Sequence, residues 1–418
     1  MNHLQKKVNY TFALSVVGLL FFVIGFALGI NGLLIPYLQK AFSLSSAESY
    51  LVLTSTFGAF VLFGYPAGIL IKHIGYKKSM VTAFLFFAIG LYLFIPSAKN
   101  ESFVLFLIAS FISGVGNTVL QAAVNPYVTI CGPIESATRR ISIMGILNKS
   151  GWAVAPVFLA LFMDLSQSTV QLSEMYLPFY IIAGVFVLLG IFTYIVPLPE
   201  IAAAGEDETQ MDSAESAEIV KFVAGKKNVF QFPHLLLGVL LLFLYVGVET
   251  ITLATPVDFA NTTGLNNPQI YPAYTVVAQV LGYLLGAILI PKAISQHRAL
   301  IFCAASGVVF SLLAVLVPVH IAIYFVALMG FSNSLIWGPV WPLAISYLGK
   351  YTKSGASLLV TAIVGGAVLP LVFGWLKDFL GDIQQAYWIC VPFYIYVLYY
   401  AFRGYKTGLK EILNNKMK

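Results

Sequence analysis

The sequence predicts an all-α membrane protein with twelve transmembrane helices in two six-helix bundles. Three features predict this fold: few charged residues, apolar segments of membrane-spanning length, and one long hydrophilic stretch near the middle of the chain. Hydrophobic residues make up 59% of the 418 positions and charged residues only 10%. Soluble domains carry about 25% charged residues because their surface faces water. The composition therefore excludes a soluble protein and requires lipid as the solvent.

Each predicted span holds about twenty mainly apolar residues, the length needed to cross roughly 30 Å of hydrocarbon. The first segment is too long for the apolar core of a signal peptide and lacks a small-residue cleavage site, so we expect it to be a span. The predicted helices cover residues 11–38, 46–71, 79–97, 102–131, 139–164, 174–197, 234–260, 270–294, 298–317, 319–348, 353–376 and 384–403.

The hydrophilic stretch at residues 198–233 divides these helices into two equal sets. Seven acidic residues are followed there by three lysines, a composition typical of a solvated, flexible linker. The sequence therefore predicts an N-terminal bundle at 1–197, a linker at 198–233 and a C-terminal bundle at 234–418.

Basic residues orient the chain across the membrane. Outside the spans, 19 lysines and arginines fall on the side that holds both termini and the linker, and three, Lys40, Lys99 and Lys377, fall on the other side. Loops rich in Lys and Arg stay in the cytoplasm. We therefore expect a multi-pass protein of the inner (plasma) membrane with cytoplasmic termini. The net charge of +6 reflects this topology and does not indicate nucleic-acid binding.

The sequence carries no signature of catalysis or metal binding. Cys131, Cys303 and Cys390 lack metal-ligand spacing, and the five histidines fall at or near predicted helix ends. No GxxxxGK[ST] phosphate-binding loop is present. We therefore expect no enzyme, no cofactor and no metal. Two helical halves around a cytoplasmic linker are instead typical of secondary transporters, which bind their substrate between the halves near the membrane midplane.

Several segments resemble a known transporter family. The loop from Gly68 to Lys78, GILIKHIGYKK, is similar to the motif G-x-x-x-D-R-x-G-R-K of the major facilitator superfamily, with Lys72 and His73 at the acidic and first arginine positions. Together with five further segments it resembles the fucose/galactose/glucose-cation symporter family, in particular its glucose/galactose branch. Those segments are Asn31–Lys40, Leu120–Val128, Leu244–Glu249, Trp341–Ser357 and Gly365–Pro370.

This resemblance implies the major facilitator fold and uptake of a hexose by alternating access, coupled to a cation that is usually a proton. The family pattern places a carboxylate in the first helix directly after an asparagine, and fucose-transporting members carry another in the fourth helix. The corresponding positions here are Gly32, after Asn31, and Gln121. The resemblance therefore leaves the coupling ion open between H⁺, Na⁺ and none.

Two ionisable residues lie deep within predicted spans, where a charge costs a few kcal/mol or more and therefore needs a partner or a function. Lys149 lies about 15 Å, and Glu249 about 22 Å, from the inner end of its helix at 1.5 Å per residue. We expect both to face a central cavity, with Glu249 as the ion-coupling group. Lys149 would balance the charge of the site or anchor an acidic sugar. The alternatives are a fixed structural carboxylate and a fixed positive charge.

Neutral polar side chains are candidates for binding sugar hydroxyls, because an amide both donates and accepts hydrogen bonds. Indole rings can pack against the apolar face of a sugar in a largely apolar pocket. The alternatives are hydrogen bonds between helices and interior packing around a broken tenth helix. With Lys149, the predicted substrate-binding residues are Asn31, Gln121, Asn148, Gln279, Asn333, Trp337 and Trp341.

The leading hypothesis is a monomeric, lipid-embedded hexose importer with H⁺ or Na⁺ as the coupling ion. An uncoupled sugar facilitator and an importer of amino or acidic sugars, including cell-wall anhydrosugars, are the near alternatives. An exporter of amphiphilic drugs is more distant, since it would need a larger and mainly apolar cavity. A sugar sensor that does not transport is a further alternative.

Overall fold

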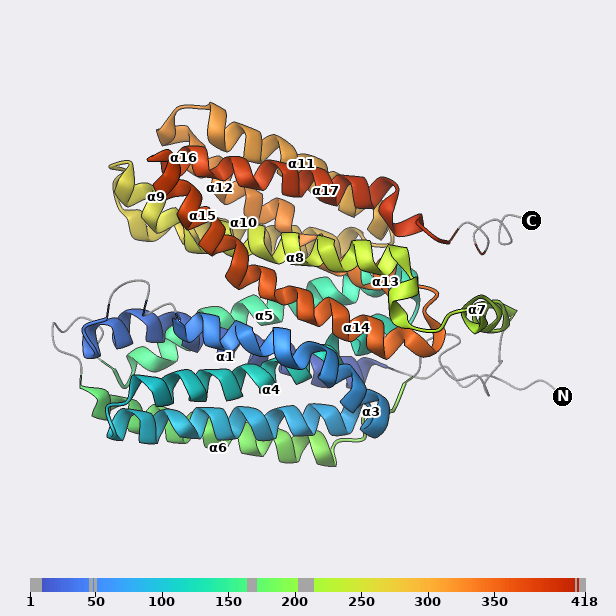
Figure 1. Cartoon of the computed structure of the whole chain (residues 1–418), viewed down its shortest axis with the longest axis horizontal. Coiled ribbons are helices and arrows are strands. Elements are labelled where there is room, and N and C mark those ends of the chain that lie inside the picture. The colour runs from blue at the N-terminus through green and yellow to red at the C-terminus, as the bar shows by residue number, and fades with distance from the viewer. Residues whose placement is uncertain are drawn as a thin grey trace.

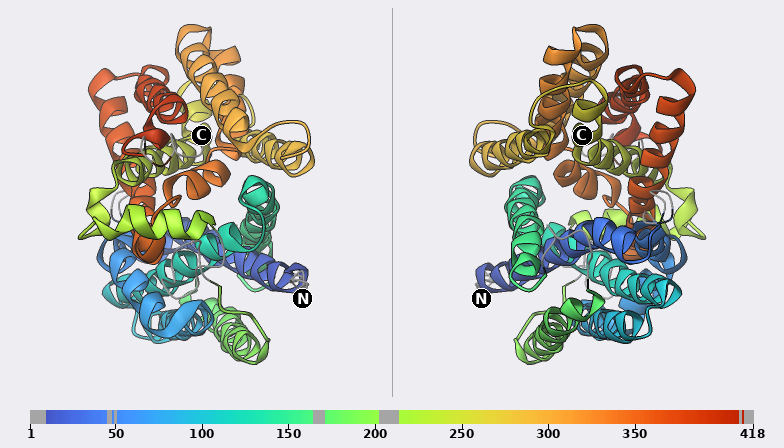
Figure 2. Two further views of the ribbon diagram at one scale, coloured as in Figure 1. Left: turned by 90° about the vertical axis from the view of Figure 1, so that its right-hand side faces the viewer. Right: turned by 90° about the vertical axis from the view of Figure 1, so that its left-hand side faces the viewer.

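The computed structural model describes residues 10–44, 48, 51–163, 171–201, 214–409 and 412, and these residues form helices joined by short turns, without strands. Most helices run along the long axis of the molecule (Figure 1). Seen from either end, the first and second halves of the chain form two separate bundles that pack against each other (Figure 2).

The described part of the first bundle contains five long helices, one of which crosses the molecule twice. α3 reverses at Gly75, where φ is 83°, a backbone conformation that favours glycine. Ser55 near its start donates to the carbonyl of Leu107, and α4 begins just after its end, so both ends of α3 lie at the same end of the bundle. The helices are α1 (Thr11–Ala41), α3 (Leu51–Lys99), α4 (Phe103–Ile130), α5 (Ala137–Ala160) and α6 (Tyr176–Ile195).

The second bundle is more interrupted than the first, because several of its crossings consist of two consecutive helices. These pairs are α8 with α9, α12 with α13, α14 with α15, and α16 with α17. The helices are α8 (Pro233–Ala254), α9 (Pro256–Thr262), α10 (Tyr271–Leu289), α11 (Gln296–Leu316), α12 (Val319–Ser334), α13 (Trp337–Ala344), α14 (Thr352–Thr361), α15 (Gly365–Leu380), α16 (Ile383–Ala386) and α17 (Cys390–Phe402).

The described residues supply the twelve crossings that the sequence predicts. Ten of their helical segments are long and apolar enough to span a membrane when α3 is counted once. The reversal at Gly75 makes α3 two crossings. The segment from Ile383 to Phe402 adds the last, since twenty residues at 1.5 Å each reach about 30 Å.

Prolines account for two departures from the predicted helix boundaries. The prediction of one helix over 319–348 is wrong, because α12 ends at Ser334 and α13 starts at Trp337. Pro339 has no N–H to donate to the carbonyl of Leu335, four residues earlier, so the regular ladder fails there. The helix predicted at 234–260 similarly ends at Ala254, and Pro256 starts α9.

Part of the predicted flexible linker is helical. Residues Ala214–Ala224 form α7, which lies at one end of the molecule (Figure 1). Ile219 and Val223, one helical turn apart, are buried, and the carbonyl of Lys226 just after α7 accepts a hydrogen bond from Tyr351 Oη at 2.9 Å. An apolar stripe at helical spacing therefore docks this part of the linker onto the second bundle. Residues 202–213 of the linker lie outside the described residues.

The start of α1, helix α7 and the end of α17 lie at the same end of the molecule, on the right in Figure 1. We call this the linker end, and the opposite end, which carries the connection between α1 and α3, the loop end. Each crossing therefore joins the linker end to the loop end, as an even number of spans requires.

Helices α1 and α5 approach so closely that glycine is required between them. A Cβ on Gly25 of α1 would lie only 1.8 Å from the carbonyl oxygen of Asn148 on α5. We expect Gly25→Ala to push the helices apart, cost ~2 kcal/mol, and lower the melting temperature by about 5 °C. The measurement is thermal unfolding of the purified protein followed by intrinsic fluorescence.

Gly184→Ala is the matched control. Gly184 lies in α6, where an added Cβ would point into open space, so we expect the melting temperature of the variant to stay within about 2 °C of wild type or to rise slightly through better helix propensity. Equal melting temperatures for the two variants would contradict the tight α1–α5 contact.

Candidate functional site

A cavity of about 560 Å³ lies between the two bundles. Its size falls within the range of small-molecule sites. The first bundle contributes wall residues from α1, α3, α4 and α5, and the second from α8, α10 and α13. The wall extends from Ile141 and Tyr283, toward the linker end, to Gln39 and Ala254 near the loop end.

At the linker end the cavity is closed by direct contact between the bundles. Thr138 on α5 donates to Gln296 Oε1 on α11 at 2.9 Å. Glycines bring helices of the two bundles together at further points: a Cβ on Gly338 would lie 2.8 Å from Thr138 Cγ2, and one on Gly68 would lie 2.5 Å from Ser357 Cβ. The wall of the cavity continues from this contact toward the loop end, at Gln39 and Ala254.

The centre of the site is an ion pair between the bundles. Lys149 Nζ on α5 lies 3.3 Å from Glu249 Oε1 on α8, and both side chains line the cavity. They are 15% and 16% exposed, so both are largely withdrawn from water yet reachable through the cavity. Removing either partner would leave an unpaired charge at membrane depth, which is strongly unfavourable. The pair therefore ties the two bundles together across the cavity.

Three further side chains surround Glu249. Gln279 Nε2 on α10 donates a hydrogen bond to Glu249 Oε1, the oxygen that also contacts Lys149. Tyr245 and Tyr283 line the cavity beside them. Tyr245 precedes Glu249 by four residues, and Tyr283 follows Gln279 by four. Both tyrosines were missed in the sequence, although this spacing places them on the same helix faces as the predicted residues.

The first bundle contributes amides to the wall. Gln121 on α4 lines the cavity, is 7% exposed, and donates to Asn117 Oδ1 at 3.0 Å. Asn148 on α5 also lines it and donates to the carbonyl of Phe21 on α1 at 3.1 Å. Trp152, one turn after Asn148, adds an aromatic wall that the sequence reasoning missed. Asn31 lies in α1, but its side chain is outside the described residues.

Of the two predicted tryptophans, only Trp337 reaches the cavity. Its Nε1 donates to Asn125 Oδ1 at 3.3 Å, which links α13 to α4 across the bundles. Trp341 is fully buried behind it, with ring centroids 5.7 Å apart. In this conformation Trp341 packs behind Trp337 and does not line the cavity, as the packing alternative expects.

Gln279 and Asn333 also do not form part of the cavity wall in this conformation, and both are fully buried. Asn333 Nδ2 donates to Thr252 Oγ1 at 3.1 Å, and Asn333 Oδ1 accepts from Tyr394 Oη at 2.7 Å. Asn333 thus joins α8, α12 and α17 within one bundle, so the interhelical alternative accounts for it. Gln279 contacts Glu249 from behind the cavity wall.

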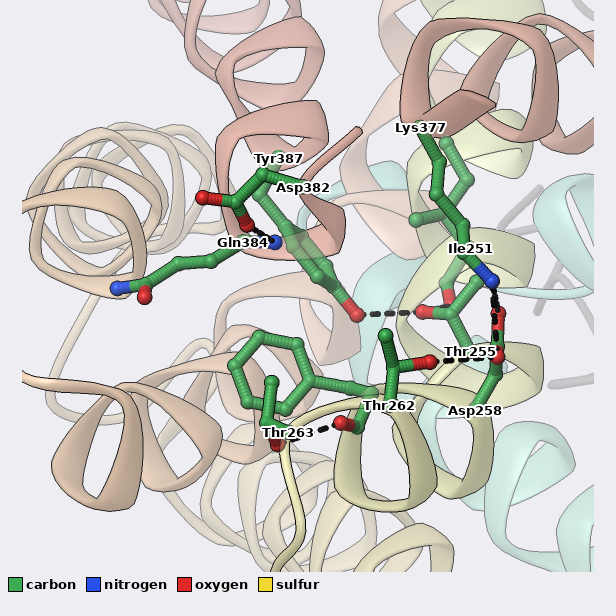
Figure 3. Close-up of polar contacts among 10 residues, drawn as sticks. Ile251, Thr255, Asp258, Thr262, Thr263, Lys377, Asp382, Gln384 and Tyr387 are labelled. Carbon is green, nitrogen blue, oxygen red and sulfur yellow. Dashed lines mark hydrogen bonds and ion pairs between the residues drawn. The ribbon is translucent and has the colours of Figure 1, made fainter. Parts of the chain in front are cut away.

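A second polar cluster lies at the loop end of the second bundle (Figure 3), and its residues do not line the cavity. Lys377 Nζ on α15 contacts both carboxylate oxygens of Asp258 on α9, at 2.9 and 2.7 Å. Thr255 and Tyr387 share a hydrogen bond beside it. These contacts join elements of one bundle only. Asp258 therefore offers a paired carboxylate that is comparable with Glu249 but outside the site.

Residues 17–363 match the model of the Major Facilitator Superfamily. The chain belongs to the major facilitator superfamily. It is 34% identical over 413 residues to a glucose/galactose transporter of Brucella abortus biovar 1 (strain 9-941), covering 96% of each chain. It is 27% identical over 403 residues to the L-fucose-proton symporter of Escherichia coli (strain K12), covering 90% of each. These findings confirm the family resemblance predicted from the sequence.

Solved structures confirm the fold. The transporter FucP in its outward conformation superimposes with a TM-score of 0.80 at 24% identity, covering 94% of this chain and 99% of that one. The proton:xylose symporter XylE bound to 6-bromo-6-deoxy-D-glucose gives a TM-score of 0.74 at 16% identity, covering 94% and 95%. At these identities the likeness bears on the fold alone, and it supports the predicted all-α arrangement of two six-helix bundles.

The different surroundings of Asn333 and Gln121 predict different effects on stability. Asn333→Leu leaves the buried Tyr394 hydroxyl without its acceptor, so we expect a cost of ~1–3 kcal/mol and a melting temperature lower by about 5 °C. Gln121→Leu removes the donor to Asn117 Oδ1, but it does so beside the cavity, where water can take the place of the amide, so the melting temperature should change by less than about 2 °C. Thermal unfolding of both variants checks this; a larger loss for Gln121→Leu would contradict the placement of the two amides.

Proposed function

We propose that the chain is a secondary active importer of a hexose and that it works by alternating access between its two bundles. The observation that carries this proposal is the Lys149–Glu249 ion pair, which crosses the bundle interface inside a cavity of sugar-compatible size. Rocking of the bundles around such a site would expose it to one side of the membrane and then to the other.

The orientation of the site in the membrane follows from the charges of the loops. Basic residues cluster at the linker end, for example Lys77, Lys78, Arg298 and Lys350. By the positive-inside rule this end is cytoplasmic. The cavity, closed at the linker end by the bundle contacts, would then face the outside, ready to take up substrate. A multi-pass protein of the inner (plasma) membrane, acting as a monomer, fits this arrangement.

The cavity suits a polyhydroxylated substrate. The amides of Gln121 and Asn148 can each donate to and accept from hydroxyl groups. The rings of Trp152 and Trp337 offer flat surfaces for the apolar face of a sugar ring. A neutral hexose of the glucose, galactose or fucose type is the substrate class that these groups and the names of the relatives support together.

Glu249 is the proposed ion-coupling group. It is the carboxylate that lines the described cavity, and the two family positions for acidic residues hold Gly32 and Gln121 instead. Lys149 supports a second candidate function, import of an acidic sugar, because its ammonium group could pair with a substrate carboxylate.

The test is uptake of radiolabelled D-glucose, D-galactose, L-fucose and an acidic sugar into proteoliposomes, with proton and sodium gradients imposed separately. Accumulation of a neutral hexose under one gradient supports the proposal and identifies the ion. Equilibration without accumulation would indicate an uncoupled facilitator. Uptake of the acidic sugar alone would replace the first candidate by the second, and absence of all uptake would contradict both.

Replacing the carboxylate should separate accumulation from exchange. Glu249→Gln keeps the size of the side chain but cannot ionise, so we expect gradient-driven accumulation to fall to the equilibrium level while exchange of internal for external sugar continues. The measurement compares uphill uptake with counterflow in the same vesicles.

Asp258→Asn is the matched control for this variant, because it neutralises a paired carboxylate in the loop-end cluster outside the cavity. We expect it to retain accumulation. If Glu249→Gln also retained wild-type accumulation, Glu249 would have no role in coupling.

A further inference from the structure

One oxygen of Glu249 is contacted from both bundles. Lys149 Nζ from α5 forms an ion pair with Glu249 Oε1, and Gln279 Nε2 from α10 donates a hydrogen bond to the same atom. Lys149 is thus held on Glu249 while it lines the cavity that would bind the sugar. As long as this pair is intact, the ammonium group is directed at Glu249 and away from the substrate.

Gln279 carries a second feature that its contact with Glu249 does not explain. It is fully buried, and its Oε1 atom has no hydrogen-bond partner among the described residues. Leaving a buried acceptor unpaired costs free energy. A primary amide donates through nitrogen and accepts through oxygen, so Gln279 can pair with a carboxylate through Nε2 and with a carboxylic acid O–H through Oε1. Gln279 can therefore form a hydrogen bond with Glu249 in either protonation state of that carboxyl group.

The other titratable groups around Glu249 are neutral phenols. Tyr283 on α10, Tyr394 on α17 and Tyr245 on α8 itself interact with it electrostatically. On α9, Asp258 is already paired with Lys377 of α15 in the loop-end cluster. Among the described groups near Glu249, Lys149 is therefore the positive charge whose pairing depends on the ionisation of Glu249.

We propose that Lys149 is a sugar-binding residue whose availability is switched by a proton on Glu249. When Glu249 takes a proton from water in the open cavity, its carboxylate becomes a neutral acid and its new O–H is donated to Gln279 Oε1. The ion pair is lost, and Lys149 keeps its charge and its three N–H groups. The ammonium group, on its flexible four-carbon stem, then donates to hydroxyl oxygens of the sugar.

The surroundings of Glu249 favour a proton over a metal cation in this role. The ion pair is neutral, and either cation would leave the site with a single net positive charge. A sodium ion would keep its own charge beside the ammonium group of Lys149, whereas a proton turns Glu249 into a neutral acid that can donate its O–H to Gln279 Oε1. Proton and sugar therefore favour each other's binding, since each stabilises the state in which Lys149 has left Glu249, and this reciprocity is the thermodynamic basis of symport.

This inference rests on the proposed function, and an equilibrium binding experiment separates the two. Binding of D-glucose, D-galactose and L-fucose to the purified full-length protein is measured by calorimetry between pH 5 and pH 9, without any gradient. We expect the affinity for the bound sugar to rise at least about tenfold as the pH falls, because the protonated form is the one that releases Lys149. A pH-indicator dye at low concentration should also report that the protein takes up protons when the sugar is added.

Three variants locate the switch. Glu249→Gln should bind the sugar at every pH with the affinity that wild type reaches at low pH, and Lys149→Met should bind weakly at every pH. Gln279→Leu should weaken the pH dependence, because it removes the acceptor for the proton on Glu249. Asp258→Asn, outside the site, should follow the wild-type profile.

The inference would be overturned if wild type bound the sugar tightly at every pH without taking up protons. That result would not contradict the proposed importer. Wild-type affinity in Lys149→Met at low pH would also overturn it. Absence of binding for all three sugars would contradict the proposed function, and the inference with it. The dye measurement on wild type needs no variant, so the test survives if a substitution prevents folding.

Discussion

The ion pair between Lys149 and Glu249 is the interaction on which the arrangement of this transporter depends. Each charge alone would be strongly unfavourable at membrane depth, and together they are tolerated only where the two bundles meet around a cavity. Because one partner comes from each bundle, the pair links the bundles. Substrate or ion binding that breaks the pair would also change the contact between the bundles. Gln279 orients the carboxylate, and the glycine contacts at the linker end allow the two bundles to pack closely there.

The family resemblance predicts carboxylates in the first and fourth helices, and this chain carries its cavity carboxylate at a different position. Gly32 and Gln121 occupy those positions here, and the carboxylate lies instead on α8 of the second bundle, opposite a lysine of the first. Coupling through such a site would act directly across the bundle interface. The uncharged wall of Gln121, Asn148 and Trp337 is then free to bind the sugar.

Much of this could be predicted from the sequence, because the bilayer constrains it strongly. Apolar length fixes the twelve crossings, and the cost of burying charge singles out Lys149 and Glu249. The same reasoning fails for neutral amides: Gln121 and Asn333 look alike in sequence, yet one lines the cavity and the other ties helices together. No feature of the sequence around these two amides distinguishes them, because the neighbouring helices determine which face of a helix points into the cavity. The breaks in the second bundle and the docking of α7 likewise depend on packing that a hydropathy pattern does not encode.

Infrared difference spectroscopy of the protonation state of Glu249 tests the central claim most directly. Adding a transported sugar at constant pH should produce the carbonyl absorption of a newly protonated carboxylic acid, absent from Glu249→Gln and unchanged in Asp258→Asn. That result would place a proton on Glu249 as Lys149 turns to the sugar. A wild-type spectrum in which sugar binding leaves every carboxylate ionised would contradict the account, because the ion pair would then be a fixed tie between the bundles.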